Sequence, residues 1–196
     1  EMYRGNALDP KDLDGMFEGC DAAFYLIHSM EGGVGDVDAF VERDREAALN
    51  FSKAAAEAGI EQIIYVSGLE PEEEVSAHLR SRNDVELYLG EYDVPVTVLR
   101  AGFIIGPESA GFQMLDGITG QMSLMMISED LHHETQPAYV ADVVEALALC
   151  AEHPDKVRGE VFEIGSEEVV EYFDIIRAFC RYGNRNIDFI EVPWVP

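Results

Sequence analysis

The strongest constraint in the sequence is an alternation of short β-rich runs with longer amphipathic stretches. Ala22–His28 and Gln62–Ser67 are nearly continuous apolar runs, which is typical of strands that are covered on both faces. Between them, apolar residues recur at intervals of three, four and seven over Val37–Ala58, and this spacing predicts a long helix that ends at Gly59. Such strand–helix–strand units predict an α/β fold with a parallel sheet and helices on both of its faces.

The same alternation continues through the rest of the chain, with less regular spacing after Gly106. Helices are predicted over Pro10–Phe17, Ser76–Tyr92, Ser109–Gly120, Tyr139–Glu152 and Val170–Tyr182, and strands or short apolar runs over Val94–Ala101, Phe103–Ile105, Leu124–Ile127, Glu160–Ile164 and Ile187–Val192. We therefore expect a regular core followed by a small, irregular C-terminal region. In open parallel sheets, ligands bind beyond the carboxyl ends of the strands.

The excess of acidic over basic residues limits the classes of partner that the chain is expected to bind. The 196 residues include 39 acidic and 13 basic residues, which gives a formal net charge of −26. This balance argues against nucleic acid, because phosphates require lysine and arginine to replace their counterions. We interpret the acids as a solvated surface adapted to molar salt, where screening acts over about 3 Å; an acidic docking surface for a basic partner is the alternative. No run of about 18 apolar residues occurs, so no membrane span is predicted.

The cysteine and histidine patterns do not predict a metal site. Cys20, Cys150 and Cys180 are far apart and have no zinc-ligand spacing. We expect core or near-core thiols in a reducing cytoplasm, which gives a cytoplasmic location. His132 and His133 are adjacent in a predicted loop, where neighbouring imidazoles rarely bind one ion together, so we expect no metal.

A glycine-rich phosphate-binding turn is missing from the sequence. Dinucleotide-binding folds begin with a strand, such a turn, and a helix whose N-terminus holds the pyrophosphate. Gly32–Gly35 is the nearest candidate, but its spacing is wrong and it follows a strand that is not the first. Since Glu1 lies in a strand-like segment, we expect the first strands, about 50 residues, to lie outside this chain. The alternative is a complete small protein with another topology.

Six motifs, taken in order, carry a resemblance to a known family. They are Gly5–Pro10, Gly19–Met30, Tyr65–Ser67, Leu99–Pro107, Gln136–Val144 and Gly159–Gly165. Their order and spacing resemble the atypical or extended short-chain dehydrogenase/reductases, in the branch of NmrA-like and epimerase-like NAD(P)-binding proteins. The resemblance covers nearly the whole chain and implies a Rossmann-like sheet and NAD or NADP as cofactor. It implies an NAD(P)-binding core over 1–106, incomplete at its N-terminus, and a C-terminal part over 107–196 with the substrate-side segment and the last core elements.

The family's active site uses a serine and then a Tyr-x-x-x-Lys motif on the following helix. Ser67 matches the serine, and alignment on Glu86 puts His78 in the tyrosine place and Arg82 in the lysine place. The resemblance then implies that Ser67 orients a substrate oxygen, His78 supplies a proton and Arg82 holds the ribose. The alternatives are a solvated polar helix face for His78 and Arg82, and a strand-end serine that caps the next turn.

Cofactor contacts are implied at the ends of the strands and near the adenine turn. The candidate residues are Asn6, Ala7, Leu26, Ile27, His28, Ser67, Gly68, Arg82, Ala101, Gly102, Phe103 and Ile104. Asn6 stands where the family usually has an aspartate, and a satisfied buried histidine is an equal reading of His28. Gly102 and Gly106 are expected to allow a close backbone approach.

The apolar residues of the C-terminal part have two readings. Met122, Met125 and Met126 could line an apolar substrate pocket near Phe112 and Leu115, but core packing is the favoured reading.

Three functions are compatible with these observations. The first is hydride transfer between a nicotinamide cofactor and a small carbonyl or quinone-like substrate. The second is a non-catalytic NAD(P)-sensing regulator or assembly factor, which the missing tyrosine and lysine favour. The third is a sugar-nucleotide epimerase or dehydratase, against which His78 and the 13 basic residues count. An exposed sheet edge would favour a homo-oligomer.

Overall fold

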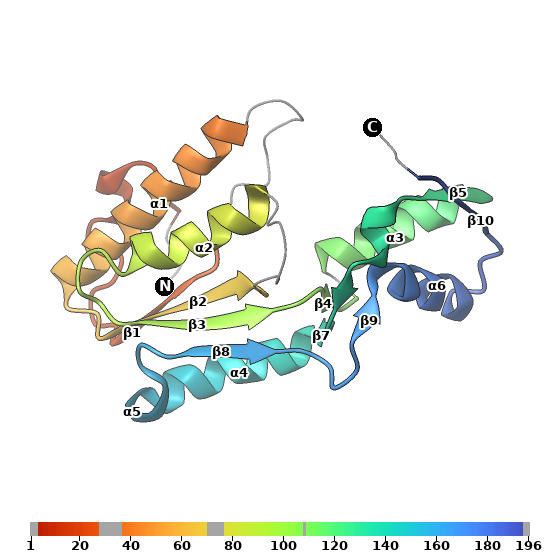
Figure 1. Ribbon diagram of the computed structural model, residues 1–196. Coiled ribbons are helices and arrows are strands. Elements are labelled where there is room, and N and C mark those ends of the chain that lie inside the picture. Colours follow the sequence, from red (N-terminus) through yellow and green to blue (C-terminus); the bar gives the residue numbers. More distant parts are fainter. Residues whose placement is uncertain (1–3, 28–36, 70–76, 108, 194–196) are drawn as a thin grey trace. The chain divides into compact units, whose positions relative to one another are not determined.

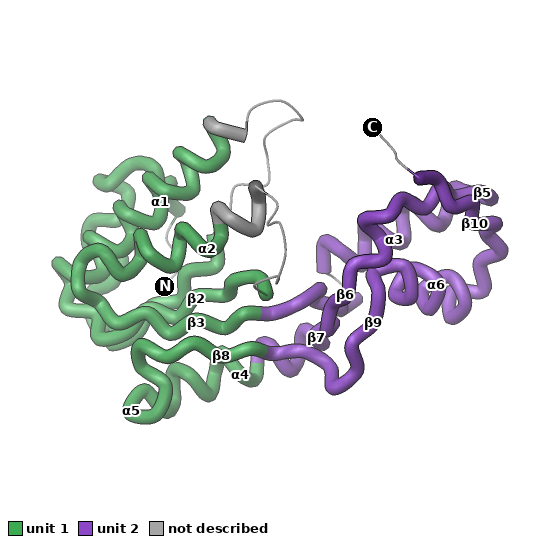
Figure 2. The backbone as a smooth tube through the Cα atoms, viewed as in Figure 1, with its two compact units in different colours: residues 1–100, 145–163 green, residues 101–144, 164–196 purple. Residues whose placement is uncertain are grey.

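The computed structural model describes residues 4–27, 37–69, 77–107 and 109–193. The chain forms two compact units that interleave along the sequence (Figure 2): residues 1–100 with 145–163, and residues 101–144 with 164–196. We call them unit 1 and unit 2. The division at residue 106 expected from the sequence is a division by function, and it stays a prediction.

Unit 1 is built on a four-stranded sheet in the order β1-β2-β3-β8 (Figure 1). The strands are β1 (Ala22–Tyr25), β2 (Gln62–Gly68), β3 (Val96–Ala101) and β8 (Val161–Ile164). β1 pairs with β2 in parallel, with Tyr25 opposite Tyr65, and the arrows of β2, β3 and β8 point the same way (Figure 1). The predicted parallel α/β fold is confirmed.

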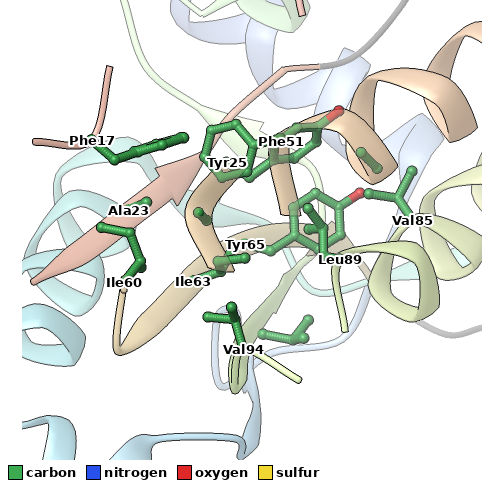
Figure 3. Close-up of a cluster of buried hydrophobic side chains, with 13 residues drawn as sticks. Phe17, Ala23, Tyr25, Phe51, Ile60, Ile63, Tyr65, Val85, Leu89 and Val94 are labelled. Carbon is green, nitrogen blue, oxygen red and sulfur yellow. The ribbon is translucent and has the colours of Figure 1, made fainter. Parts of the chain in front are cut away.

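Helices cover both faces of this sheet because the strand residues alternate between two cores. Ile63 and Tyr65 belong to a cluster with α1 (Val37–Ala58) and α2 (Ala77–Leu89) (Figure 3). Ile64, between them, packs with Cys150 of α4 (Val140–Glu152). Side chains of successive strand residues point to opposite faces, so one strand serves both layers.

The boundaries in unit 1 are partly those that the sequence predicts. α1 has the predicted limits, whereas the predicted helix over Pro10–Phe17 is a short 3₁₀ helix, η1 (Pro10–Leu13), followed by turns. β1 ends at Tyr25, and Phe24 is 43% exposed. Among the described residues β1 is therefore covered on one face only, which corrects the prediction of a strand buried on both.

The described part of unit 2 contains two complete helices, the first residues of α4 and three two-stranded sheets. The helices are α3 (Ala110–Gln121) and α6 (Tyr172–Tyr182), with a short 3₁₀ helix, η2 (Glu129–His132). The sheets pair β4 (Ile104–Ile105) with β7 (Ala138–Tyr139), β5 (Leu124–Ile127) with β10 (Asp188–Glu191), and β6 (Glu134–Thr135) with β9 (Val170–Glu171). Leu115, Ile176 and Cys180 form the buried centre of this unit.

Some short elements differ from the prediction. Val170 and Glu171 form a strand instead of the first turn of α6, and Pro154–Val157 form a one-turn helix, α5, in unit 1. Two-residue strands have no periodicity, so only their pairing partners reveal them.

Glycine permits close packing at two positions in unit 2. A Cβ on Gly106 would lie 2.4 Å from Val140 Cγ1, which confirms the predicted close approach there. A Cβ on Gly111 would lie 2.5 Å from Phe103 Cζ, so the Phe103 ring rests directly against the backbone of α3.

The three cysteines are free thiols. Cys150 and Cys180 are buried, and burial raises the pKa of both thiols. Cys20 is exposed in the turn before β1, so the prediction of a core or near-core thiol is wrong for this residue. Within the described ranges, no helix is both long and apolar enough to cross a membrane.

Candidate functional site

Ser67 lies at the carboxyl end of β2, where a parallel sheet presents ligand-binding groups. The residue is 1% exposed, and no hydrogen bond of normal geometry to its Oγ is found among the described residues. An unpaired buried hydroxyl costs about 1–3 kcal/mol, so a hydroxyl in this position calls for a partner. The Ser67 hydroxyl therefore keeps hydrogen-bonding capacity that the described residues do not use.

Tyr65 connects β2 to the helix that carries Arg82. Its hydroxyl donates a hydrogen bond of 3.3 Å to the Arg82 carbonyl oxygen. Burial raises the pKa of Tyr65 to about 12, against the lowering effect of the Arg82 guanidinium and the Ser67 hydroxyl. Tyr65 therefore stays protonated at neutral pH, and the structure brings Ser67, Tyr65 and Arg82 into one neighbourhood.

Four further buried polar atoms in unit 1 have no hydrogen-bond partner among the described residues, and two of them belong to residues beside Tyr65 or Arg82. The Tyr25 hydroxyl and Asn83 Oδ1 are buried without a hydrogen-bond partner among the described residues. The rings of Tyr25 and Tyr65 are 5.9 Å apart, and burial, followed by the nearby charge of Asp44, raises the pKa of Tyr25 well above its ordinary value. Sequence reasoning missed both residues, although an in-register alignment of the two strands would have paired the tyrosines.

An ion pair holds α2 against β3. Arg100 Nη2 lies 3.0 Å from one Glu86 oxygen and Arg100 Nε 3.3 Å from the other, and both side chains are mostly buried. Glu86 is one helical turn after Arg82, so this pair fixes the part of α2 that carries the candidate ribose-binding residue. In the sequence Glu86 served only to anchor the alignment.

The structure describes little of the two candidate histidines, His28 and His78. His78 lies in α2 four residues before Arg82, which puts the two residues on one face of the helix. The His78 side chain and all of His28 lie outside the described part of the chain. Their roles stay predictions.

The candidate cofactor residues of unit 1 lie in loops and at strand ends. Asn6 Oδ1 accepts a hydrogen bond from the Leu8 backbone, and Asn50 of α1 donates to the Ala7 carbonyl, so the predicted adenine turn is held in place. Leu26 and Ile27, directly after β1, are 58% and 45% exposed, and Gly68 ends β2 in a buried position. Their contact with a cofactor stays a prediction.

The remaining four candidates, Ala101–Ile104, belong to unit 2. Ala101 is buried, and Ile104 pairs with Ala138 in the short β4–β7 sheet. The Phe103 ring packs edge-on against Tyr172, with centroids 6.2 Å apart. These contacts explain the backbone conformation of Ala101–Ile104. The predicted contact of this segment with a cofactor stays a prediction.

A pocket of about 680 Å³ opens in unit 2, and sequence reasoning found only part of it. Its lining is Phe103, Ile105, Phe112, Leu115, Asp116, Pro137, Val170, Asp174, Ile175, Ala178, Phe179, Tyr182, Gly183 and Arg185. Ile175, Phe179 and Tyr182 recur at helical spacing on α6, a signal that predicts an apolar face but not a hollow beside it.

One of the three methionines, Met125, follows the packing reading, and the other two follow neither reading. Phe112 and Leu115 line the pocket, but none of the three methionines does. Met125 packs against the core of unit 2, while Met122 and Met126 are 49% and 60% exposed.

The adjacent histidines bind separate partners. His132 Nδ1 lies 2.7 Å from Glu171 Oε2, and His133 Nδ1 lies 2.9 Å from the Asp130 carbonyl oxygen. No group of three or more potential metal ligands is found in the part of the chain that the structure describes.

Comparison with known proteins gives a family and a fold. Residues 1–147 match the model of a family described as NAD(P)H-binding. None of the curated proteins compared matches the chain.

Among solved structures, UDP-glucose 4-epimerase from Thermotoga maritima is similar at 18% identity and a TM-score of 0.77, over 97% of this chain and 71% of that chain. UDP-glucuronic acid 4-epimerase from Bacillus cereus, in complex with NAD, is similar at 18% identity and 0.78, over 97% and 68%. The dTDP-4-dehydrorhamnose reductase from Bacillus anthracis, in complex with NADP, is similar at 12% identity and 0.76, over 96% and 72%. At these identities the likeness shows the fold alone.

Proposed function

Because the chain belongs to the NAD(P)H-binding family, we propose that it is part of an NAD(P)-dependent oxidoreductase of the atypical short-chain dehydrogenase/reductase type. The reaction is hydride transfer with a small carbonyl or quinone-like substrate. The observation that carries this proposal is the buried Ser67 hydroxyl at the carboxyl end of β2, near Tyr65 and Arg82, which has no hydrogen-bond partner in the part of the chain that the structure describes.

The described residues fit the strand-end part of a nicotinamide cofactor site. Ser67 offers a buried hydroxyl with no partner among the described residues, and the exposed residues Leu26 and Ile27 follow β1 directly. The sequence contains no glycine-rich turn for the pyrophosphate. When bound, the cofactor supplies or accepts a hydride at the nicotinamide ring.

Each candidate residue then has a distinct task. Ser67 donates a hydrogen bond that orients the substrate oxygen, and His78 holds the proton that this oxygen gains or loses. Arg82 donates to the ribose hydroxyls. Tyr65, protonated at neutral pH, holds the Arg82 backbone through its bond to the carbonyl oxygen.

The test is a titration of NADH and NADPH at molar KCl, followed by turnover with a panel of carbonyls and quinones, on the full natural chain. Arg82→Gln should weaken cofactor binding. Ser67→Ala should weaken cofactor binding less than Arg82→Gln does and should lower turnover by about 100-fold, the effect of losing one positioned catalytic group. Binding of neither cofactor by the native chain would refute the proposal.

A second candidate is a non-catalytic NAD(P)-sensing regulator or assembly factor. It is favoured by one observation, that His78 and Arg82 occupy the places of the usual tyrosine and lysine. Tight cofactor binding with no turnover on the whole panel would select it. Turnover that depends on Ser67 would exclude it.

The proposed setting is a cytoplasm with molar salt. The formal net charge of −26 predicts that the folded state gains stability from about 0.1 M to about 2 M KCl, as repulsion between carboxylates is screened. Thermal unfolding followed by circular dichroism measures this gain, and sedimentation at the same salt tests for a homo-oligomer.

A further inference from the structure

We propose that the pocket of unit 2 binds an uncharged aromatic ring system, and that it excludes ligands with a phosphate or diphosphate group. This deepens the proposed function by naming the substrate class, and it rests on that function for the identity of the ligand as substrate. Because ligand binding is measured without any cofactor, the test of this pocket is separate from the test of the proposed function.

The size and walls of the pocket suit a planar apolar molecule. Its volume of about 680 Å³ is within the range of small-molecule sites, about 300–1,000 Å³. Four of the lining side chains are aromatic: Phe103, Phe112, Phe179 and Tyr182. Phe112 and Phe179 meet edge to face with centroids 4.8 Å apart, which is the arrangement in which aromatic rings attract one another.

The Phe103 wall has a fixed position. Its ring is held between the α3 backbone at Gly111, where no side chain could fit, and the Tyr172 ring. Ser109 caps α3 by accepting a hydrogen bond of 3.2 Å from the Phe112 backbone N–H, which fixes the first turn of the helix. A ligand therefore meets a preformed surface on this side.

The charges of the lining disfavour an anion. The lining has two carboxylates, Asp116 and Asp174, and one guanidinium, Arg185. Arg185 Nη1 donates to the Asp116 carbonyl oxygen at 2.9 Å and to the Thr119 hydroxyl, and Nη2 pairs with the Asp116 carboxylate. The guanidinium also lies over the Phe179 ring, 5.1 Å from its centroid. Its charge is already compensated within the chain.

The competing possibility is an anionic ligand held by two further arginines. Arg177 and Arg181 line a second, more polar hollow. It shares Asp174, Ala178, Tyr182 and Arg185 with the first. Arg177 is 3.6 Å from Asp174 and lies over the Phe173 ring. If the ligand carried an anionic group, these arginines would have to hold it.

The probes are naphthol and naphthyl phosphate substituted at the same ring position, titrated calorimetrically into the full chain at molar salt. We expect naphthol to bind and naphthyl phosphate to bind at least about tenfold more weakly. Equal or tighter binding of the phosphate, reduced by Arg181→Gln, would overturn the proposal. Absence of naphthol binding would overturn it as well.

A large side chain introduced into the pocket tests whether naphthol binds there. Ala178 is exposed on α6 and lines the pocket, so Ala178→Trp should abolish naphthol binding without unfolding the unit. Ala148→Trp, the same change at an exposed position of α4 in unit 1, is the control and should not alter binding. Unchanged binding in Ala178→Trp would place the naphthol elsewhere and contradict the proposal.

A variant that removes the carboxylate paired with Arg185 should gain affinity for an anionic ligand. Asp116→Asn leaves Arg185 without its carboxylate, so affinity for naphthyl phosphate should rise several-fold while affinity for naphthol stays constant. No rise in phosphate affinity would refute the assigned role of Asp116. Naphthol binding together with binding of neither NADH nor NADPH would refute the proposed function and leave this site intact.

Discussion

The two units use their apolar residues differently. Unit 1 has a cluster of thirteen buried side chains from the five successive elements β1, α1, β2, α2 and β3 and their connections, with five more packed against it. The largest cluster described in unit 2 has three buried side chains and seven that are only partly buried. Unit 1 is closed around its own side chains, whereas unit 2 leaves aromatic surface facing a hollow.

Two phenylalanines make this difference concrete. Phe51 of unit 1 is 5% exposed and meets the rings of Phe17 and Tyr25 at centroid distances of 5.0 and 4.9 Å (Figure 3). Phe179 of unit 2 meets Phe112 and Arg185 but also lines the pocket. A closed core stabilises the fold with every contact, while a pocket keeps contacts available for a ligand.

The largest expected effect is the loss of a ring from the closed core. Phe51→Ala should lower the free energy of unfolding by about 3–5 kcal/mol, because a cavity forms where the surrounding structure is rigid. Phe179→Ala should cost only about 1–2 kcal/mol, because part of that ring faces the pocket. Urea unfolding at molar salt measures both, and equal losses would break the comparison between the units.

The next effect concerns the ion pair between α2 and β3. Glu86→Gln should destabilise the chain by about 2 kcal/mol, below the cost of breaking a fully buried pair because both side chains keep some exposure. Glu61→Gln is the matched control, since its pair with Arg158 is exposed and should contribute at most about 0.5 kcal/mol. Similar losses in both variants would show that burial does not distinguish the pairs.

A third effect appears at alkaline pH. The native pKa of Tyr65 is raised from 10.0 to about 12, so the native chain keeps this proton after the unfolded chain has lost it. The stability that Tyr65 contributes is complete below about pH 10 and is lost between about pH 10 and about pH 12, at about 1.4 kcal/mol per pH unit. Tyr65→Phe should make the loss of stability from about pH 8 to about pH 11 smaller by about 1.4 kcal/mol.

Urea unfolding at the two pH values measures this difference. Tyr182→Phe is the control, because Tyr182 is 88% exposed and its replacement should leave the alkaline loss unchanged. An identical loss in Tyr65→Phe and in the native chain would show that Tyr65 does not retain its proton.

The smallest effect on stability is expected at the candidate catalytic serine. Ser67→Ala removes a buried hydroxyl that has no hydrogen-bond partner among the described residues, so stability should stay the same or rise by up to about 1 kcal/mol. Turnover should nevertheless fall, which separates a functional group from a structural one. A loss of more than about 1 kcal/mol would mean that Ser67 is a structural residue.

The sequence predicted the long periodic elements well. α1 has the limits that its apolar spacing predicts, and Gln62–Ser67 is a strand with one added residue. The two-residue strands of unit 2 were missed because their existence depends on distant partners, such as Ala138 for Ile104. In the candidate site, Ser67 and Arg82 were found from motif spacing, whereas Tyr25 and the Arg100–Glu86 pair depend on which segments pack together.

The sequence by itself determined the α/β alternation, the acidic character and the position of Ser67 at a strand end, because these depend on local spacing and composition. Only the tertiary structure decided that the Ser67 hydroxyl is buried with no partner in the described ranges and that Asp116 compensates the charge of Arg185. Burial and charge pairing arise between residues far apart in the chain, and Asp116 and Arg185 are 69 positions apart. A local sequence pattern does not indicate which distant residues will contact one another in the folded chain.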